Sequence, residues 1–109
     1  MVASPPENLR GLMSRPVKFL ADAIVETRAA FLWYRKRSDI AAGRFREEIN
    51  RAIDAIGNSP EAWPAYVHET RRYLLRRFPF FVVYRVMPNK IQVVAVVHAR
   101  RRPGYWKDR

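Results

Sequence analysis

The most regular pattern of hydrophobic and polar positions lies in residues 39–57. One face of a helix drawn through this segment is apolar and carries Phe45, Ile49, Ala52, Ile53 and Ile56. The charged residues off this stripe are Arg44, Arg46, Glu47, Glu48, Arg51 and Asp54. Ser38 or Asp39 can begin the helix, and Gly57, followed by Asn58-Ser59-Pro60, predicts its end in a left-handed cap.

A preceding helix is predicted over residues 22–36. Asp22 can cap it through its side-chain oxygen. Its apolar row has three-to-four spacing and consists of Leu20, Ile24, Thr27, Phe31 and Tyr34. Cations at its C-terminal end, residues 35–37, suit the helix dipole. Two helices joined by so short a link predict an antiparallel hairpin.

The pattern changes to that of β-strands on both sides of these helices. Residues 14–20 predict a first strand, and residues 72–78, 80–86 and 91–97 predict three more, rich in β-branched and aromatic side chains. Residues 61–67 are predicted as a loop anchored by Trp63. The last two strands are apolar on both faces, so we expect one face to pack on the helices and the other to be covered in part or by a partner.

These elements predict a two-layer α+β domain of order β-α-α-β-β-β. The helix hairpin covers a mostly antiparallel, four-stranded sheet. Residues 16–109 are predicted to form this single domain. Residues 1–15, which lack any period and contain two prolines, are expected to be a flexible arm. Met13 is an alternative natural start of the chain.

Charge divides the chain unevenly. The net charge is +11, but residues 1–66 carry 10 Lys and Arg against 8 Asp and Glu, whereas residues 67–109 carry 11 against 2. Such a field favours a polyanionic partner, and an ordinary solvated basic face is the alternative. The absence of cysteine excludes disulfides, zinc–thiolate sites and cysteine nucleophiles, and it fits a reducing cytoplasm. No apolar run reaches the roughly 20 residues that span a bilayer, so we expect a cytoplasmic protein with no membrane partner.

The order of elements and several short motifs resemble the RelE/ParE superfamily of toxins from type II toxin–antitoxin modules, over residues 16–106. The motifs are Trp33-Tyr34, Asn58-Ser59-Pro60 with Trp63-Pro64, Arg71-Arg72, Arg77-Phe78-Pro79-Phe80 leading to Tyr84-Arg85-Val86, and His98 to Trp106. The resemblance implies a growth-inhibiting toxin, of the kind linked to plasmid stabilization, that a cognate antitoxin silences. RelE-like members cut messenger RNA on the ribosome, and ParE-like members poison DNA gyrase.

The resemblance to RelE-like nucleases is incomplete. A metal-free ribonuclease needs clustered cations and a proton-transfer group, for which the candidates are Arg72, Arg100, His98 and Tyr105. Cationic positions of those enzymes fall at Phe81 and Leu74 here, and their C-terminal tyrosine falls at or beside Trp106. These departures favour the ParE-like subgroup, with a metal-independent endoribonuclease as the alternative. His98 at a strand end has a plainer interpretation, a hydrogen bond to a backbone carbonyl. Neither activity requires a cofactor, and two histidines without carboxylate spacing predict no metal site.

Binding without chemistry needs a surface instead. Arg100, Arg101, Arg102, Tyr105 and Trp106 combine charge with aromatic anchors, which is typical of interface hot spots, and we expect them to contact the cellular target. The alternative for Tyr105 and Trp106 is that they fold back and seal the sheet. A non-catalytic nucleic-acid-binding module is a further hypothesis, although no known nucleic-acid-binding motif is present.

The expected antitoxin is an acidic, partly disordered protein that folds on binding. Its apolar residues are predicted to lie along the helix hairpin, near Phe31, Tyr34 and Phe45, or across the sheet. Its carboxylates are predicted to meet Arg72, Arg76 and Arg100. Trp33 and Tyr34 are expected to pack within the hairpin and not to act in function.

Overall fold

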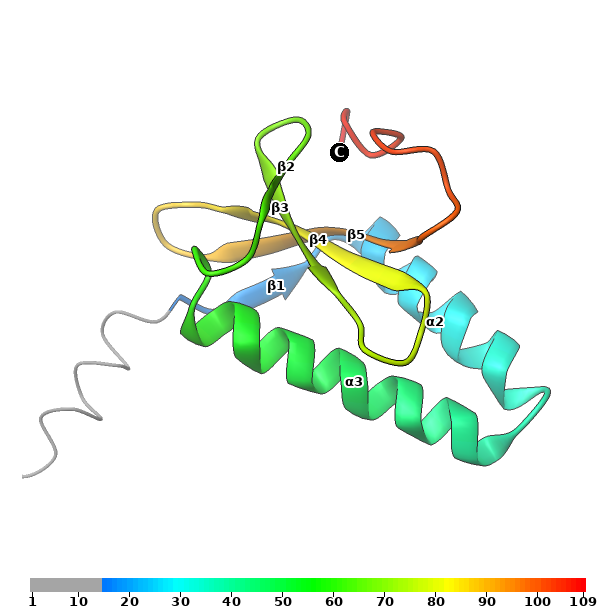
Figure 1. Cartoon of the computed structure of the whole chain (residues 1–109). Helices are drawn as coiled ribbons and strands as arrows, with labels where there is room; N and C mark the ends of the chain where they lie inside the picture. Colours follow the sequence, from blue (N-terminus) through cyan, green and yellow to red (C-terminus); the bar gives the residue numbers. More distant parts are fainter. Residues whose placement is uncertain (1–14) are drawn as a thin grey trace, which may run out of the picture.

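A computed structural model describes residues 15–109 of the chain (Figure 1). The element order is β1 (Val17–Phe19), α2 (Ala21–Arg35), α3 (Asp39–Asn58), β2 (Ala65–Tyr66), β3 (Thr70–Leu74), β4 (Phe80–Val86) and β5 (Ile91–His98). The predicted two-layer α+β architecture is confirmed. The expected N-terminal arm, apart from its last residue, and the suggested start at Met13 lie outside the described residues.

The sheet has five strands in the order β1-β5-β4-β3-β2, one more than predicted. Strand β1 is parallel to β5, and the other neighbours are antiparallel. The additional strand is β2, only two residues long, in the segment predicted as a loop. It pairs with β3 across a tight turn in which His68 and Glu69 both have positive φ, 57° and 60°. Two residues are too few to show the alternating pattern of a strand, so β2 could not be predicted from the sequence.

The helix ends differ in part from the prediction. Ser38 caps α3, accepting a hydrogen bond from the Ala41 amide at 3.1 Å as expected. Two predicted caps are wrong: Leu20, not Asp22, is the N-cap of α2, and α3 continues past Gly57, which is not left-handed, to Asn58. Within residues 15–109, neither helix is long and apolar enough to cross a membrane.

The main core lies between the helix pair and one face of the sheet. The apolar stripe of α3 is largely confirmed, because Phe45, Ile49, Ala52 and Ile56 are all buried. Helix α2 differs from its predicted row, since it turns the small residues Ala23 and Ala30 inward. Ile24, predicted to lie in that row, is 53% exposed. Two alanines let α2 approach the sheet closely and leave larger apolar side chains outside.

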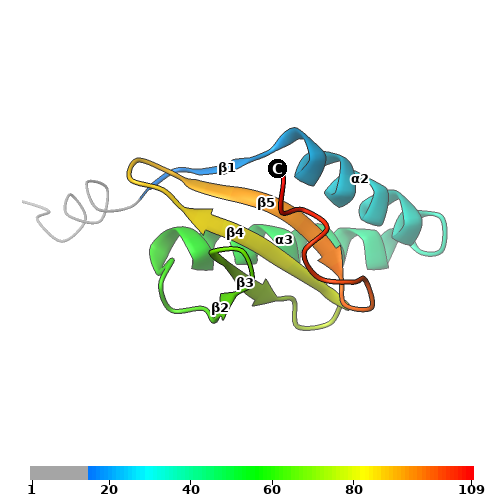
Figure 2. The ribbon, with the colours of Figure 1, turned by 90° about the horizontal axis from the view of Figure 1, so that it is seen from above.

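The opposite face of the sheet is covered by the chain's own tail, residues 99–109, which crosses above β5 and β4 (Figure 2). A β-bulge in β5 lets Val94 and Ala95 both point toward this face, which explains why the strand is apolar on both sides. Trp106 has no exposed surface and packs on Val83, Val94, Ala95 and Val97. The tail therefore covers the face for which we considered a partner.

Candidate functional site

An apolar groove runs between α2, the end of β5 and the start of the tail. Its volume is about 550 Å³. The lining residues are Glu26, Ala29, Ala30, Trp33, Tyr34, Pro79, Phe80, Val96, His98, Arg101 and Tyr105. Most of them are apolar, and the polar side chains of His98 and Arg101 lie at the end of β5 and in the tail. A concave apolar surface with a few polar groups is the usual form of a binding site.

The two neighbouring aromatic residues of α2 have different roles in this groove. Tyr34 packs against Phe45, Phe78 and Phe80, with ring centroids 5.5, 4.9 and 6.4 Å away, and burial raises its pKa. The prediction that it packs internally is correct. Trp33 is 52% exposed, and the Arg37 guanidinium lies 3.6 Å from its ring. For Trp33 the packing prediction is wrong, since its indole forms an open wall of the groove.

Glu26 fixes the tail against α2 at the base of the groove. Its carboxylate accepts hydrogen bonds from the Val96 amide at 3.0 Å and from the Tyr105 hydroxyl at 2.6 Å. The Arg109 guanidinium donates to both carboxylate oxygens, at 3.0 and 3.1 Å. Arg109 also donates to the Val94 carbonyl oxygen. Since β1 pairs only with residues 91–93 of β5, these side chains satisfy part of the strand edge that β1 leaves uncovered.

This arrangement changes the acidity of both partners of Glu26. Burial, and then the hydrogen bond and negative charge of Glu26, raise the pKa of Tyr105 far above its usual value. The hydrogen bond from Arg109 to Glu26 raises the pKa of that guanidinium. The Tyr105 hydroxyl is therefore a firmly held proton donor to Glu26, and it is poorly suited to proton transfer with a bound substrate.

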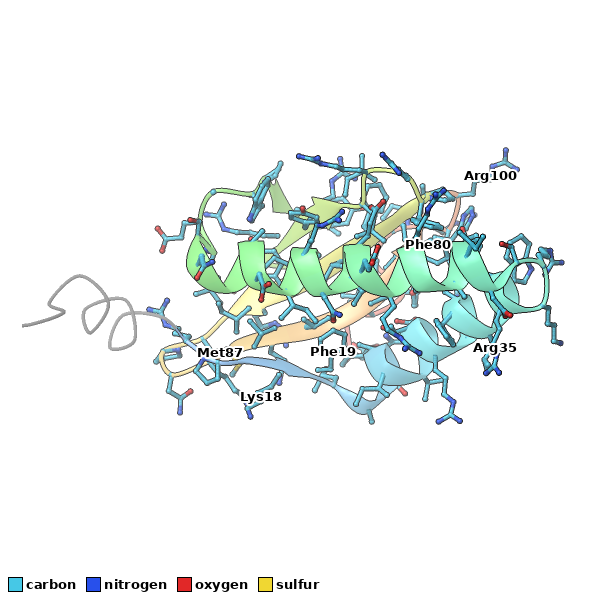
Figure 3. All side chains as sticks on the ribbon, turned by 90° about the horizontal axis from the view of Figure 1, so that it is seen from below. Lys18, Phe19, Arg35, Phe80, Met87 and Arg100 are labelled. Carbon is cyan, nitrogen blue, oxygen red and sulfur yellow. The ribbon has the colours of Figure 1, made fainter. Side chains whose placement is uncertain are left out.

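Beside the groove, two turns bring five arginines to one end of the sheet. The turn between β3 and β4 carries Arg76 and Arg77, and the turn after β5 carries Arg100, Arg101 and Arg102. We call these five residues the arginine end. The turns are adjacent, because Phe80 pairs with His98 and the Ala99 amide donates to the Pro79 carbonyl oxygen at 2.7 Å. Arg100 projects from the body of the protein at the end where Phe80 lies (Figure 3).

Both turns are held by side chains. The Glu48 carboxylate accepts from the backbone amides of Arg76 and Arg77, at 2.8 and 3.3 Å. The His98 Nδ1 accepts from the Arg100 amide at 3.1 Å, so His98 bonds the backbone, but the predicted carbonyl partner is wrong. Each contact uses a main-chain N–H, which leaves the arginine side chains themselves free to project.

Apart from Arg109, the cations of the second half form no ion pair within residues 15–109. Among residues 15–109, Arg109 is the only cationic side chain paired with carboxylates, those of Glu26 and Asp22. All five residues of the arginine end are exposed. The predicted basic surface is therefore present and open to an anionic partner.

The four candidate nuclease residues do not converge on one place. Arg72 lies on the tail-covered face, with its guanidinium 4.5 Å from the Tyr66 ring and 4.7 Å from the Phe81 ring. His98 contacts Phe80, which points to the helix side of the sheet. Arg100 is beside His98, but the Tyr105 hydroxyl is held by Glu26. Within residues 15–109 no group of three His, Asp or Glu side chains could hold a metal ion.

Two predicted contact residues lie in the core. Trp106, expected to touch the target, has no exposed surface, and its indole nitrogen has no hydrogen-bond partner. Phe45, expected to touch the antitoxin, is also fully buried. Phe45 packs on the helix side of the sheet and Trp106 on the tail side, so neither is available to a docking partner in this conformation. Phe31 is half-buried beside Phe45 and lines a second cavity of about 220 Å³.

The sequence interpretation missed the two glutamates that hold these features, Glu26 and Glu48. Each has a spacing that places it on an apolar helix face. Glu26 stands three residues after Ala23 and four before Ala30. Glu48 stands three after Phe45 and four before Ala52, although it was predicted to lie off the stripe, and it is only 6% exposed. An acidic residue at such a position signals a buried acceptor that needs donors.

Comparison with known proteins agrees with this geometry. The sequence profile of the ParE toxin of the type II toxin–antitoxin system parDE matches residues 17–103. No curated protein sequence matches the chain. A solved structure, described as the chromosomal ParDE TA system from P. aeruginosa, superposes with a TM-score of 0.70 at 19% identity, covering 80% of this chain and 98% of that one. At that identity the superposition shows a shared fold, whereas the profile match spans most of the sequence. This chain belongs to the ParE toxin family of type II toxin–antitoxin systems.

Proposed function

We propose that this protein inhibits growth by binding and blocking a cellular target, DNA gyrase in the first place, and that a cognate acidic antitoxin silences it. The observation that carries this proposal is the family match over residues 17–103. The exposed arginine end agrees with it, because inhibition by binding needs a surface and no catalytic group. We place this activity in the cytoplasm.

The groove is the place where we expect the antitoxin to bind. It has an apolar floor with the exposed Trp33 indole on one side and the cation of Arg101 on the other. An amphipathic acidic segment can lay apolar side chains against Trp33 and Phe80 while its carboxylates meet Arg101. Tryptophan and arginine are the residue types that dominate the energy of such interfaces. This position lies on the outer side of α2, whereas Phe45 is closed off inside the hairpin.

Cleavage of RNA has less support. Arg72 lies on the other face of the sheet from His98, and the Tyr105 hydroxyl donates to Glu26. A phosphorane needs its cations and its proton donor within hydrogen-bond reach of one site. The remaining neighbours, His98 and Arg100, supply at most part of that set.

Supercoiling by gyrase separates the two activities. Purified protein added to gyrase, relaxed plasmid and ATP should inhibit supercoiling, and equimolar antitoxin should restore it. Messenger RNA in a ribosome-containing translation extract should remain intact. Ribosome-dependent cutting that is lost in Arg100→Ala or His98→Ala, together with unimpeded supercoiling, would replace this proposal with the nuclease.

A pair of neighbouring substitutions tests the groove. Trp33→Ala should weaken antitoxin binding about 100-fold, which corresponds to roughly 2.7 kcal/mol for a hot-spot tryptophan. Leu32→Ala is the matched control, since Leu32 is 41% exposed on the same helix but does not line the groove. Its affinity, measured by titration calorimetry, should change less than threefold. Equal losses in the two variants would place the antitoxin elsewhere on α2.

A further inference from the structure

The arginine end differs in chemistry from the surfaces on which proteins usually dock. Its side chains are all arginine, all exposed, and free of carboxylate partners among the described residues. Arginine offers a planar fork of five N–H donors that matches phosphate oxygens. Arg101 stacks 4.0 Å above the Tyr105 ring, an arrangement that keeps the N–H groups in its plane available. The set is suited to an array of phosphates.

The two turns hold these arginines ready for binding. Glu48 bonds the amides of Arg76 and Arg77, and His98 bonds the amides of Arg100 and Arg101 through its ring nitrogen and carbonyl oxygen. The backbone at the arginine end is therefore fixed before a ligand arrives. Only the arginine side chains then lose conformational entropy on binding, which raises the affinity for a ligand of regular charge spacing.

The exposed apolar side chains lie mostly elsewhere. Of the large hydrophobic residues that are exposed, five belong to the helices, and Val67 and Leu74 lie on the β2–β3 turn and on β3: Ile24, Val25, Leu32, Trp33, Ile40, Val67 and Leu74. A protein interface has an apolar core depleted of charge, with charged residues at its rim. The arginine end has charge at its centre, so its composition favours a polyphosphate over an acidic protein.

Duplex and single-stranded nucleic acids make different demands on such a surface. Proteins that hold single strands stack the bases on exposed aromatic rings. At the arginine end Phe78 is half-buried and the Tyr105 ring is covered by Arg101. A duplex presents phosphates and keeps its bases inside, which requires no aromatic platform. We infer that the arginine end binds the phosphate backbone of duplex DNA. This site shares only Arg101 with the groove and does not depend on the identity of the toxin's protein target.

Fluorescence anisotropy of a labelled duplex of about 20 base pairs, titrated with the full chain, tests the inference. Five phosphate contacts predict that log K falls with log salt with a slope of about −4.5. The double variant Arg76→Glu/Arg77→Glu should weaken binding at least tenfold and reduce the magnitude of the slope by about 2. Should that variant lose its circular dichroism spectrum, Arg100→Glu/Arg102→Glu tests the same surface.

The matched control is Lys18→Glu/Lys90→Glu, which changes the net charge by the same amount. Lys18 lies on β1 at the end of the molecule opposite Arg100 (Figure 3), and Lys90 is in the turn before β5. Its affinity for the duplex should change less than threefold. Equal weakening by both double variants would overturn the inference, because binding would follow net charge alone. Competition by poly-glutamate as strong as by unlabelled duplex, or tighter binding of a single strand, would overturn it as well.

Discussion

The groove and the arginine end lie side by side, yet they are built in opposite ways. The groove is a concave apolar surface whose wall is a helix, and its exposed indole belongs to Trp33. The arginine end is an exposed, charged surface carried by two turns. They meet at Arg101, which lines the groove and belongs to the arginine end. A small domain can thus present a surface suited to protein and one suited to polyanions without a second domain.

One glutamate underlies each surface. Glu26 on α2 gathers the Val96 amide, Tyr105 and Arg109, and so fixes the tail side of the groove. Glu48 on α3 gathers only the amides of the β3–β4 turn. Glu26 is part of an ion pair that joins residues 83 positions apart in sequence, whereas Glu48 bonds neutral groups. The difference predicts that the groove depends more strongly on its carboxylate than the arginine end does.

Replacing Glu26 should have the largest effect. Glu26→Ala leaves Arg109 without its main partner in a half-buried position, and removing one member of such a pair costs about 3 kcal/mol. The free energy of unfolding, from urea denaturation, should fall by that amount. The tail should become more accessible to protease, and antitoxin binding should weaken with it.

The duplex affinity of the Glu26→Ala protein is the informative control. Because the arginine end is held by Glu48 and His98, binding to DNA should change less than threefold. Loss of both activities together would contradict the conclusion that the groove and the arginine end are held by different side chains. Glu26→Gln, which keeps an oxygen for the Val96 amide, should lose less stability than Glu26→Ala.

Alkaline pH should have the next largest effect on the stability of the protein. Tyr84 is fully buried and donates to the Pro60 carbonyl oxygen, and burial raises its pKa to about 12. The pKa of Tyr105 is raised by burial and Glu26. A raised pKa means that the folded state holds the proton more tightly, so the stabilisation is complete below the unfolded pKa of about 10 and is lost as the pH rises toward the folded value. Together the two tyrosines should lower stability by about 2 kcal/mol between pH 10 and pH 11.

Tyr105→Phe measures how much of this loss of stability comes from Tyr105 in the groove. The variant keeps the ring and removes the titrating hydroxyl, so its loss of stability over the same pH interval should be about half that of the parent protein. Urea denaturation at both pH values measures the difference. An unchanged pH dependence in the variant would show that Tyr105 does not titrate near Glu26 as its surroundings require.

The fold was largely predictable because its strongest signals are long and periodic. The stripe of α3 and the β-branched runs of β4 and β5 each repeat over at least seven residues. Two elements escaped prediction for physical reasons. β2 is too short to show a period, and α2 buries alanines whose weak hydrophobicity is outweighed in sequence by Ile24. Hydrophobic periodicity does not detect a very short strand or a helix face made of small side chains.

The site was less predictable, because its contacts join distant parts of the chain. The basic end was visible in sequence as charge. Whether Trp106 would face a partner or the sheet depended on the bulge at Val94 and on the path of the tail, neither of which has a local pattern. Trp33 was expected inside the hairpin, and its exposure follows from the orientation of α2 that Ala23 and Ala30 permit. The groove therefore results from tertiary packing that has no local pattern in the sequence.

The smallest expected effect is that of Glu48→Ala. The amides of Arg76 and Arg77 lie in an exposed turn, so water can replace the lost acceptor, and stability should fall by only about 1 kcal/mol. The turn becomes less ordered, so duplex affinity should weaken about threefold with little change in the salt slope, since no charge of the arginine end is removed. Antitoxin affinity should stay the same. A loss of antitoxin binding as large as that of Trp33→Ala would show that Glu48 supports the groove after all, because α3 lies directly beneath α2's aromatic cluster through Phe45 and Tyr34.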